Sequence, residues 1–87
     1  MIPIRWSEMA LAGLERLIAP ERVPAARKAI DLKLGFAGGS GLRRLTVFGD
    51  RPIYVFTLFA GVILRIVVEI GEYAVVWHVG RQPDATG

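Results

Sequence analysis

The apolar residues in the first part of the chain recur every three or four positions, as they do on one face of a helix. The first such stripe consists of Leu11, Leu14, Leu17 and Ile18. Ser7 precedes it as a good N-cap, Glu8 makes the first turn acidic, and Pro20 ends it. The pattern therefore predicts a first helix between Ser7 and Pro20.

A second stripe of the same period predicts a second helix over residues 21–34. Its members are Val23, Ala26, Ile30 and Leu34. Pro24 fits the first turn of a helix, so the start lies between Glu21 and Pro24. Gly35 is a suitable C-terminal stop, and the glycine-rich segment 35–41 indicates a flexible linker.

An uncharged, mostly apolar run covers residues 52–64, between Arg51 and Arg65. Its thirteen residues are fewer than the roughly 20 that a membrane-spanning helix needs. Of the 18 residues 53–70, twelve are β-branched or aromatic, and these types favour strands. We therefore expect no membrane span and predict three strands instead, at 53–59, 62–70 and 73–79.

Together these elements predict one α+β domain over residues 1–87. A short edge strand within residues 1–6, where Pro3 is tolerated, comes first. Two helices and then a three-stranded antiparallel meander follow it. The amphipathic helices are expected to pack on one face of the sheet, which gives two layers.

Side chains alternate along strands, so the turns decide which residues share a face of the sheet. If residues 60–61 and 71–72 are two-residue loops, Arg65 lies opposite both Phe56 and His78. A slip by one residue would exchange the faces of a whole strand. The face predicted to receive the helices carries Val55, Thr57, Phe59, Val62, Leu64, Ile66, Val68, Ile70, Tyr73, Val75, Trp77 and Val79. The other face carries Tyr54, Phe56, Leu58, Ile63, Arg65, Val67, Glu69, Ala74, Val76 and His78.

Composition adds an expectation about partners. Hydrophobic residues make up 53% of the chain, more than a small domain buries, so we expect an apolar patch that a partner covers. Lys and Arg number 11 against 8 Asp and Glu, and the net charge of +3 favours an anionic partner, either nucleic acid or an acidic protein, unless it serves solubility alone. The chain has no cysteine, which excludes disulfides and cysteine-based metal sites. We also expect no secretory signal at the N-terminus.

Arg65 and His78 are the residues whose predicted positions suggest chemistry. A guanidinium in mid-sheet can bind phosphate or stabilise a developing negative charge, and an imidazole can transfer a proton near neutral pH. The structural alternative is a local ion pair between Arg65 and Glu69, with His78 as a half-buried sheet residue. Residue types alone favour this structural alternative.

Two stretches resemble the RelE/ParE superfamily of bacterial type II toxins. IRWSEMALAGLERL, residues 4–17, resembles the family's opening strand and Ser-capped first helix. LRIVVEIGEYAVVWHVGRQPD, residues 64–84, resembles its closing hairpin, with an early Arg, a tight turn, and Val-Gly before a basic residue. With the second helix and the strand at 53–59, the resemblance covers nearly the whole chain. It implies a toxin of a bacterial or archaeal cytoplasm, held by a cognate antitoxin in a hetero-oligomer, without cofactor or metal.

For the RelE-like branch, the resemblance implies ribosome-dependent cleavage of mRNA, in which a 2′-hydroxyl attacks the adjacent phosphate. By position, Arg65 matches the family's transition-state-stabilising arginine and Arg81 its second basic residue, with Gln82 as the neighbouring alternative. His78 or Tyr54 is the candidate for proton transfer. The candidates for substrate binding are Arg43, Arg44, Arg51, Tyr54 and Gln82.

Two alternatives to a nuclease stay open. A ParE-like toxin binds and poisons DNA gyrase and carries no nuclease site, which suits a strand at 53–59 without Lys or Arg. A non-catalytic module with the toxin fold would only bind an antitoxin-like partner.

Overall fold

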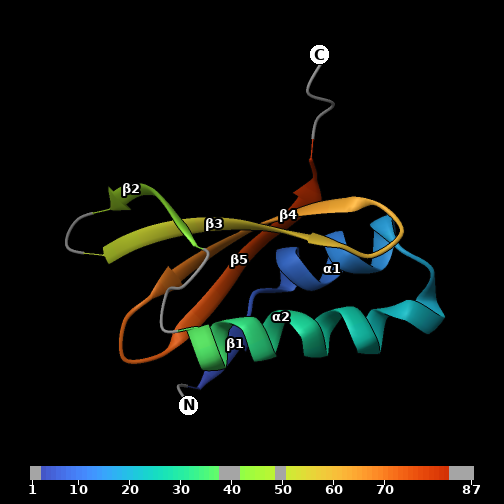
Figure 1. Cartoon of the computed structure of the whole chain (residues 1–87), viewed down its shortest axis with the longest axis horizontal. Coiled ribbons are helices and arrows are strands. Elements are labelled where there is room, and N and C mark those ends of the chain that lie inside the picture. The colour runs from blue at the N-terminus through green and yellow to red at the C-terminus, as the bar shows by residue number, and fades with distance from the viewer. Residues whose placement is uncertain (1–2, 38–41, 49–50, 83–87) are drawn as a thin grey trace.

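The computed structural model describes residues 3–37, 42–48 and 51–82, with the backbone alone at positions 36, 37 and 43–48. Its elements are, in chain order, β1 (Ile4–Trp6), α1 (Glu8–Leu17), the 3-10 turn η1 (Pro20–Arg22), α2 (Val23–Ala37), β2 (Arg43–Phe48), β3 (Arg51–Phe59), β4 (Ile63–Ile70) and β5 (Ala74–Arg81) (Figure 1).

The strands form one mixed sheet in the order β1-β5-β4-β3-β2. β1 is an edge strand parallel to β5, and the other neighbours are antiparallel. The α+β class is therefore confirmed, and the N-terminal edge strand is present. The sheet as a whole is not a three-stranded antiparallel meander, because it is mixed and also contains β2 beside β3, β4 and β5. The prediction missed β2, because two arginines open this short segment and mask its strand character, and edge strands commonly carry such charges.

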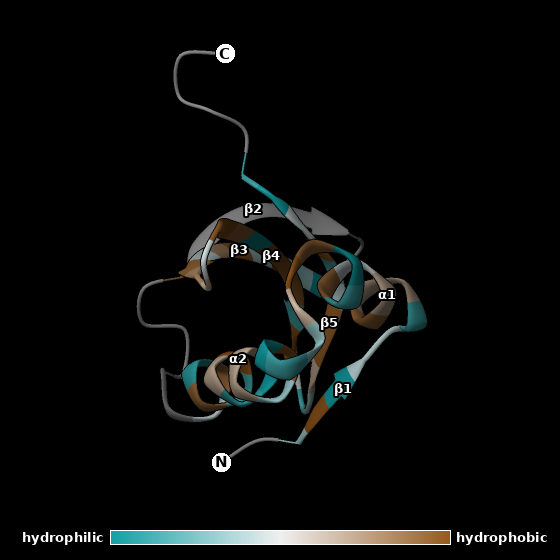
Figure 2. Ribbon diagram, turned by 90° about the vertical axis from the view of Figure 1, so that its right-hand side faces the viewer, coloured by the Kyte–Doolittle hydropathy of each residue, from teal (hydrophilic) through white to brown (hydrophobic). Residues whose placement is uncertain are grey.

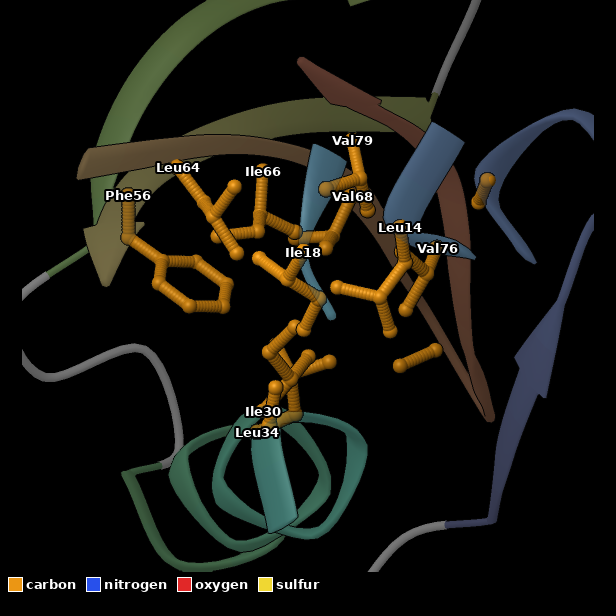
Figure 3. Close-up of a cluster of buried hydrophobic side chains, with 13 residues drawn as sticks. Leu14, Ile18, Ile30, Leu34, Phe56, Leu64, Ile66, Val68, Val76 and Val79 are labelled. Atoms are coloured by element: carbon orange, nitrogen blue, oxygen red, sulfur yellow. The ribbon is translucent and has the colours of Figure 1, made fainter. Parts of the chain in front are cut away.

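Both helices pack on the same face of the sheet, as predicted (Figures 1 and 2). One cluster of buried side chains joins them to β3, β4 and β5 (Figure 3). Removing a side chain of this size from water stabilises a fold by ~1.5–3 kcal/mol. The largest fully buried members are Leu14, Ile30, Leu34, Leu64, Ile66, Val68 and Val76.

The helix boundaries follow mostly from caps and prolines. Ser7 is the N-cap of α1, as predicted, and its Oγ accepts a hydrogen bond from the Ala10 N–H at 3.0 Å. α2 begins at Val23, within the predicted range, because η1 precedes it. It continues to Ala37, so the predicted stop at Gly35 is wrong. A single glycine inside a helix costs only about 1 kcal/mol, which the surrounding turns can offset.

The uncharged run at residues 52–64 is strand, as predicted: it fills most of β3 and reaches β4 through a turn. In the described part of the chain, no helix is long and apolar enough to cross a membrane. Both hairpin turns have three residues instead of two, since Phe59 pairs with Ile63 and Ile70 with Ala74. This difference of one residue changes the predicted faces of two strands.

In β3 the longer turn exchanges the two faces. Tyr54, Phe56 and Leu58 lie on the helix side and contact the core, although the prediction placed them on the other side. β4 keeps its predicted faces, with Leu64 and Ile66 fully buried under the helices.

In β5 the predicted faces are exchanged in the first part of the strand and correct in the last part, because a β-bulge lies between the two parts. Before the bulge the predicted faces are exchanged, so Ala74 and Val76 are buried under the helices. After the bulge they are as predicted, and Val79 is buried. Trp77 is the extra residue that restores the alternation. The pairs on either side of it are Val67 with His78 and Val68 with Val76.

Candidate functional site

The open face, defined as the side of the sheet opposite to the helices, carries Arg65. Its side chain projects there because the neighbouring Leu64 and Ile66 are buried on the helix side. In mid-sheet, Arg65 pairs with Thr57 of β3 and Gly80 of β5. The prediction that this arginine projects away from the helices is confirmed.

A shallow pocket of about 320 Å³ opens beside the Arg65 side chain. Its lining residues are Val55, Thr57, Arg65 and Gln82. The Gln82 backbone N–H donates to the Ile63 carbonyl at 2.9 Å, which fixes the chain at this point. Guanidinium, amide and hydroxyl groups all donate hydrogen bonds, so this pocket suits an anion such as phosphate.

His78 pairs with Val67, so the predicted register that placed it directly opposite Arg65 is wrong. The imidazole nevertheless approaches Arg65 by another route. It leans over Gly80: a Cβ added at this glycine would lie 2.8 Å from the imidazole Cε1. Because Gly80 is the cross-strand partner of Arg65, the ring and the guanidinium occupy neighbouring positions on the open face.

Arg81 is exposed and pairs with Leu64, whose side chain is buried on the helix side. Cross-strand partners share a face, so the sheet separates Arg81 from Arg65. The structure therefore does not bring together the two arginines expected to act jointly. Gln82, the neighbouring alternative, is the residue that lines the pocket of Arg65.

Tyr54 is half-buried on the helix side, where it packs against the core and pairs with Val68. It was a candidate for proton transfer and substrate binding, and the structure places it on the opposite side of the sheet from Arg65. The exchanged faces of β3 are the reason.

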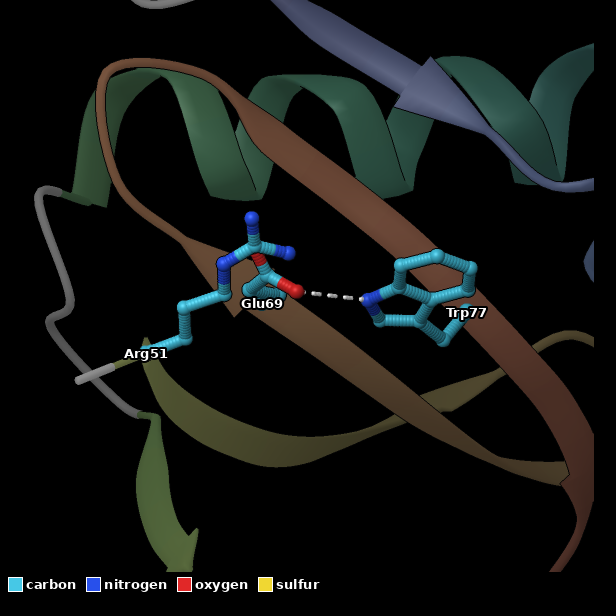
Figure 4. Close-up of polar contacts among 3 residues, drawn as sticks. All are labelled: Arg51, Glu69 and Trp77. Carbon is cyan, nitrogen blue, oxygen red and sulfur yellow. Dashed lines mark hydrogen bonds and ion pairs between the residues drawn. The ribbon is translucent and has the colours of Figure 1, made fainter. Parts of the chain in front are cut away.

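Glu69 joins two other side chains of the open face (Figure 4). Its Oε1 accepts a hydrogen bond from Trp77 Nε1 at 3.1 Å, and its Oε2 lies 3.6 Å from Arg51 Nη1. The carboxylate thus pairs with Arg51 of the neighbouring strand and not, as in the structural alternative, with Arg65. Arg51, a predicted substrate-binding residue, is 65% exposed in this pair. Sequence reasoning placed Trp77 on the helix side because it assumed a two-residue turn before β5, and the three-residue turn puts Trp77 on the open face instead.

The open face collects guanidinium groups from three strands. Besides Arg51 and Arg65 it includes Arg5 of β1, whose guanidinium carbon lies 4.5 Å from the centroid of the Tyr73 ring. Among the strand residues that the structure describes, Glu69 is the only carboxylate. The face therefore has a positive balance, which is what an anionic partner requires.

Two predicted substrate-binding residues, Arg43 and Arg44, lie in β2. Their backbones pair with Val55 and Tyr54 of β3. Their side chains lie outside the described part of the structure.

Comparisons with protein-family models, with curated proteins and with solved structures found no match to this chain. Within residues 3–37, 42–48 and 51–82, no three His, Cys, Asp or Glu residues form a group that could hold a metal ion. The resemblance to RelE/ParE toxins therefore stays a prediction.

Proposed function

We propose that this chain is a RelE/ParE-type toxin and that its open face cleaves mRNA at Arg65 during translation. The observation that carries the proposal is the position of Arg65. Its guanidinium projects from mid-sheet into a pocket with Gln82, and the imidazole of His78 lies one position away. This places a cation, a hydrogen-bonding amide and a proton-transfer group on one accessible surface.

The arrangement of elements gives the proposal its second support. The resemblance implies a short strand that leads into a Ser-capped helix, then a second helix and a closing hairpin. β1, α1, α2 and the β4–β5 hairpin occur in that order, with the helices on one face. The same arrangement leaves the other face of the sheet accessible to a substrate.

The proposed reaction uses side chains of this chain alone. The 2′-oxygen of a ribose forms a bond to the adjacent phosphorus, and the bond from phosphorus to the 5′-oxygen breaks. The 2′-hydroxyl loses a proton and the departing 5′-oxygen gains one, which leaves a cyclic phosphate. Arg65 stabilises the additional negative charge on the phosphate oxygens, and His78 takes part in the proton transfers. Gln82 donates a hydrogen bond that orients the phosphate.

A cognate antitoxin is the second partner in this proposal, within a bacterial or archaeal cytoplasm. Phe59 and Ile63 form a cross-strand pair beside the β3–β4 turn and are 75% and 50% exposed. Such an exposed apolar pair is what a protein partner would cover.

A gyrase-binding toxin is the competing candidate, and one observation favours it. The sheet separates Arg81 and Tyr54 from Arg65, so the open face holds fewer of the nuclease residues than the resemblance implies. A toxin that acts by binding alone needs no such cluster.

Controlled expression in bacteria tests the nuclease proposal. The wild-type chain should stop growth and reduce incorporation of labelled amino acids before DNA synthesis falls. Arg65→Ala should lower mRNA cleavage on translating ribosomes by ~10²-fold or more, because a transition-state cation is lost. Arg81→Ala, on the other side of the sheet, is the matched control and should leave cleavage nearly unchanged.

DNA damage signalling with normal early translation would contradict the nuclease proposal and support a toxin that binds gyrase. Unchanged growth on expression of a folded chain would leave only the binding module. Equal loss of cleavage in both arginine variants would contradict the assignment of the open face.

A further inference from the structure

We infer that Trp77 stacks on an unpaired base of the RNA that Arg65 contacts, so that the open face selects single-stranded over duplex RNA. This inference rests on the proposed function and deepens it. It names the strand state of the substrate and a residue that positions it.

The Trp77 indole is held in one orientation yet remains accessible. Its polar edge is occupied, because Nε1 donates to Glu69, while the side chain as a whole is 45% exposed. The part left for a partner is therefore the carbon surface of the ring, which is the part that stacks on a base. A ring already fixed in place loses little further conformational entropy on binding.

Glu69 and Arg51 provide this fixed orientation (Figure 4). One carboxylate oxygen holds the indole and the other holds the Arg51 guanidinium, and the Glu69 side chain is only 16% exposed. The ion pair offsets the negative charge that would otherwise repel a phosphate. The Arg51 side chain is 65% exposed, so its guanidinium is accessible to the backbone next to the stacked base.

The spacing of the residues suits a short segment of single strand. The bulge places Trp77 and His78 on the open face together, beside Val67 and Glu69 of β4. Glu69 is four residues along β4 from Arg65, about 13 Å at roughly 3.3 Å per residue. A phosphate at Arg65 and a base at Trp77 are thus a few nucleotides apart at most.

The charge and the chemistry of the face favour RNA over a protein segment as occupant. Three guanidinium groups, those of Arg5, Arg51 and Arg65, lie on this face. Among the described residues of the β-strands, Glu69 has the one carboxylate, and it is already paired with Arg51. Cations interleaved with an accessible aromatic ring are typical of surfaces that bind single-stranded nucleic acid. A duplex keeps its bases stacked within the helix and offers no free ring to Trp77.

Tryptophan fluorescence gives a direct test. The chain has 2 Trp, and the other one, Trp6, donates to Asp31 and is half-buried. In a Trp6→Phe variant, Trp77 is the sole emitter. A short single-stranded RNA with 2′-O-methyl groups, which it cannot cleave, should quench Trp77 emission on titration. The same sequence as a duplex should bind at least several-fold more weakly.

The binding variants are made in the chain that retains Trp6, so the binding measurements do not depend on the Trp6→Phe substitution. With a fluorescently labelled strand followed by anisotropy, Trp77→Leu should weaken binding by about 10-fold, and Trp77→Phe by much less, because stacking needs an aromatic ring. Glu69→Gln keeps an oxygen that can accept from the indole and should stay close to wild type. Glu69→Ala frees the indole and should weaken binding.

The outcomes separate the inference from the proposed function. Unchanged Trp77 emission, equal affinity for single strand and duplex, or an unaffected Trp77→Leu variant would overturn the inference, even if Arg65→Ala still abolished cleavage. Quenching of Trp77 by single-stranded RNA, without any cleavage that depends on Arg65, would support the inference about Trp77 and contradict the nuclease proposal. Loss of growth arrest in Trp77→Leu with unchanged RNA affinity would mean that the face contacts a protein instead, and would also overturn it.

Discussion

At the scale of single residues, Gly80 determines where the His78 imidazole lies relative to the strand position of Arg65. The imidazole lies over the position where any other residue at 80 would place its Cβ. Gly80 is also the direct cross-strand partner of Arg65. A glycine at this position therefore lets the imidazole lie over the residue that pairs with Arg65.

Substitution at this glycine should move the imidazole without unfolding the chain. In Gly80→Ala the new methyl group would lie 2.8 Å from Cε1, and a side-chain ring can rotate away from such a contact. We expect a clear shift of the His78 Hε1 resonance, which is easily assigned because the chain has 1 His. Cleavage should fall with it if His78 transfers protons, typically by 10²-fold or less.

The control for this prediction is Gly71→Ala, where no atom lies within 4 Å of the added Cβ. It should leave the His78 resonance in place. An unmoved resonance in Gly80→Ala would contradict the described position of the ring.

At the scale of elements, the close contact of α1 with β5 aligns the two layers. Gly13 of α1 meets the carbonyl of Val79 so closely that a Cβ there would overlap with the carbonyl oxygen. Ser7, just before α1, adds a hydrogen bond of 2.9 Å from its Oγ to the Trp77 carbonyl. Helix and strand are thus joined at the bulge residue Trp77 and again two residues later at Val79.

Gly13→Ala should therefore destabilise the fold, although alanine is the better helix former. The obstacle is backbone, so α1 must shift, and such overpacking costs typically ~1–3 kcal/mol. The gain in helix propensity is only about 1 kcal/mol. We expect a lower midpoint of urea unfolding than in the wild type, with Gly71→Ala as the nearly neutral comparison. A higher midpoint in Gly13→Ala would contradict the close packing of α1 on β5.

The whole molecule is a two-layer domain in which one face of the sheet builds the core and the other meets partners. The core lies between the helices and the sheet, and in β1, β3, β4 and β5 the charged side chains lie on the open face or at a strand end. The positive balance of the open face comes from Arg5, Arg51 and Arg65 against Glu69. This separation lets one small sheet provide both stability and a binding surface.

RNA binding should accordingly depend on salt in a way that identifies the arginines involved. The logarithm of the association constant should fall linearly with the logarithm of salt concentration, by about 0.7 per phosphate contact on a single strand. Arg65→Ala should reduce that slope by about one such contact, and Arg81→Ala should not. An equal reduction in both variants, measured by anisotropy with the uncleavable RNA, would contradict a contact confined to the open face.

The sequence alone determined both helices and four of the five strands, all except β2, because these elements follow from local periods, caps and side-chain types. Ser7, the stripe of α2 and the β-branched run after Arg51 each specify their element without any distant contact. The projection of Arg65 away from the helices was also predictable, since the faces of β4 follow from its own alternation.

Only the tertiary structure decided which residues accompany Arg65. Side chains alternate with a period of two, so one additional residue in a turn exchanges the two faces of a strand. The three-residue turn before β4 put Tyr54 on the helix side, the three-residue turn before β5 put Trp77 on the open face, and the bulge in β5 returned His78 to that face. Turn length and bulge position are set by how the layers pack, and for that reason the pattern of a single strand could not reveal them.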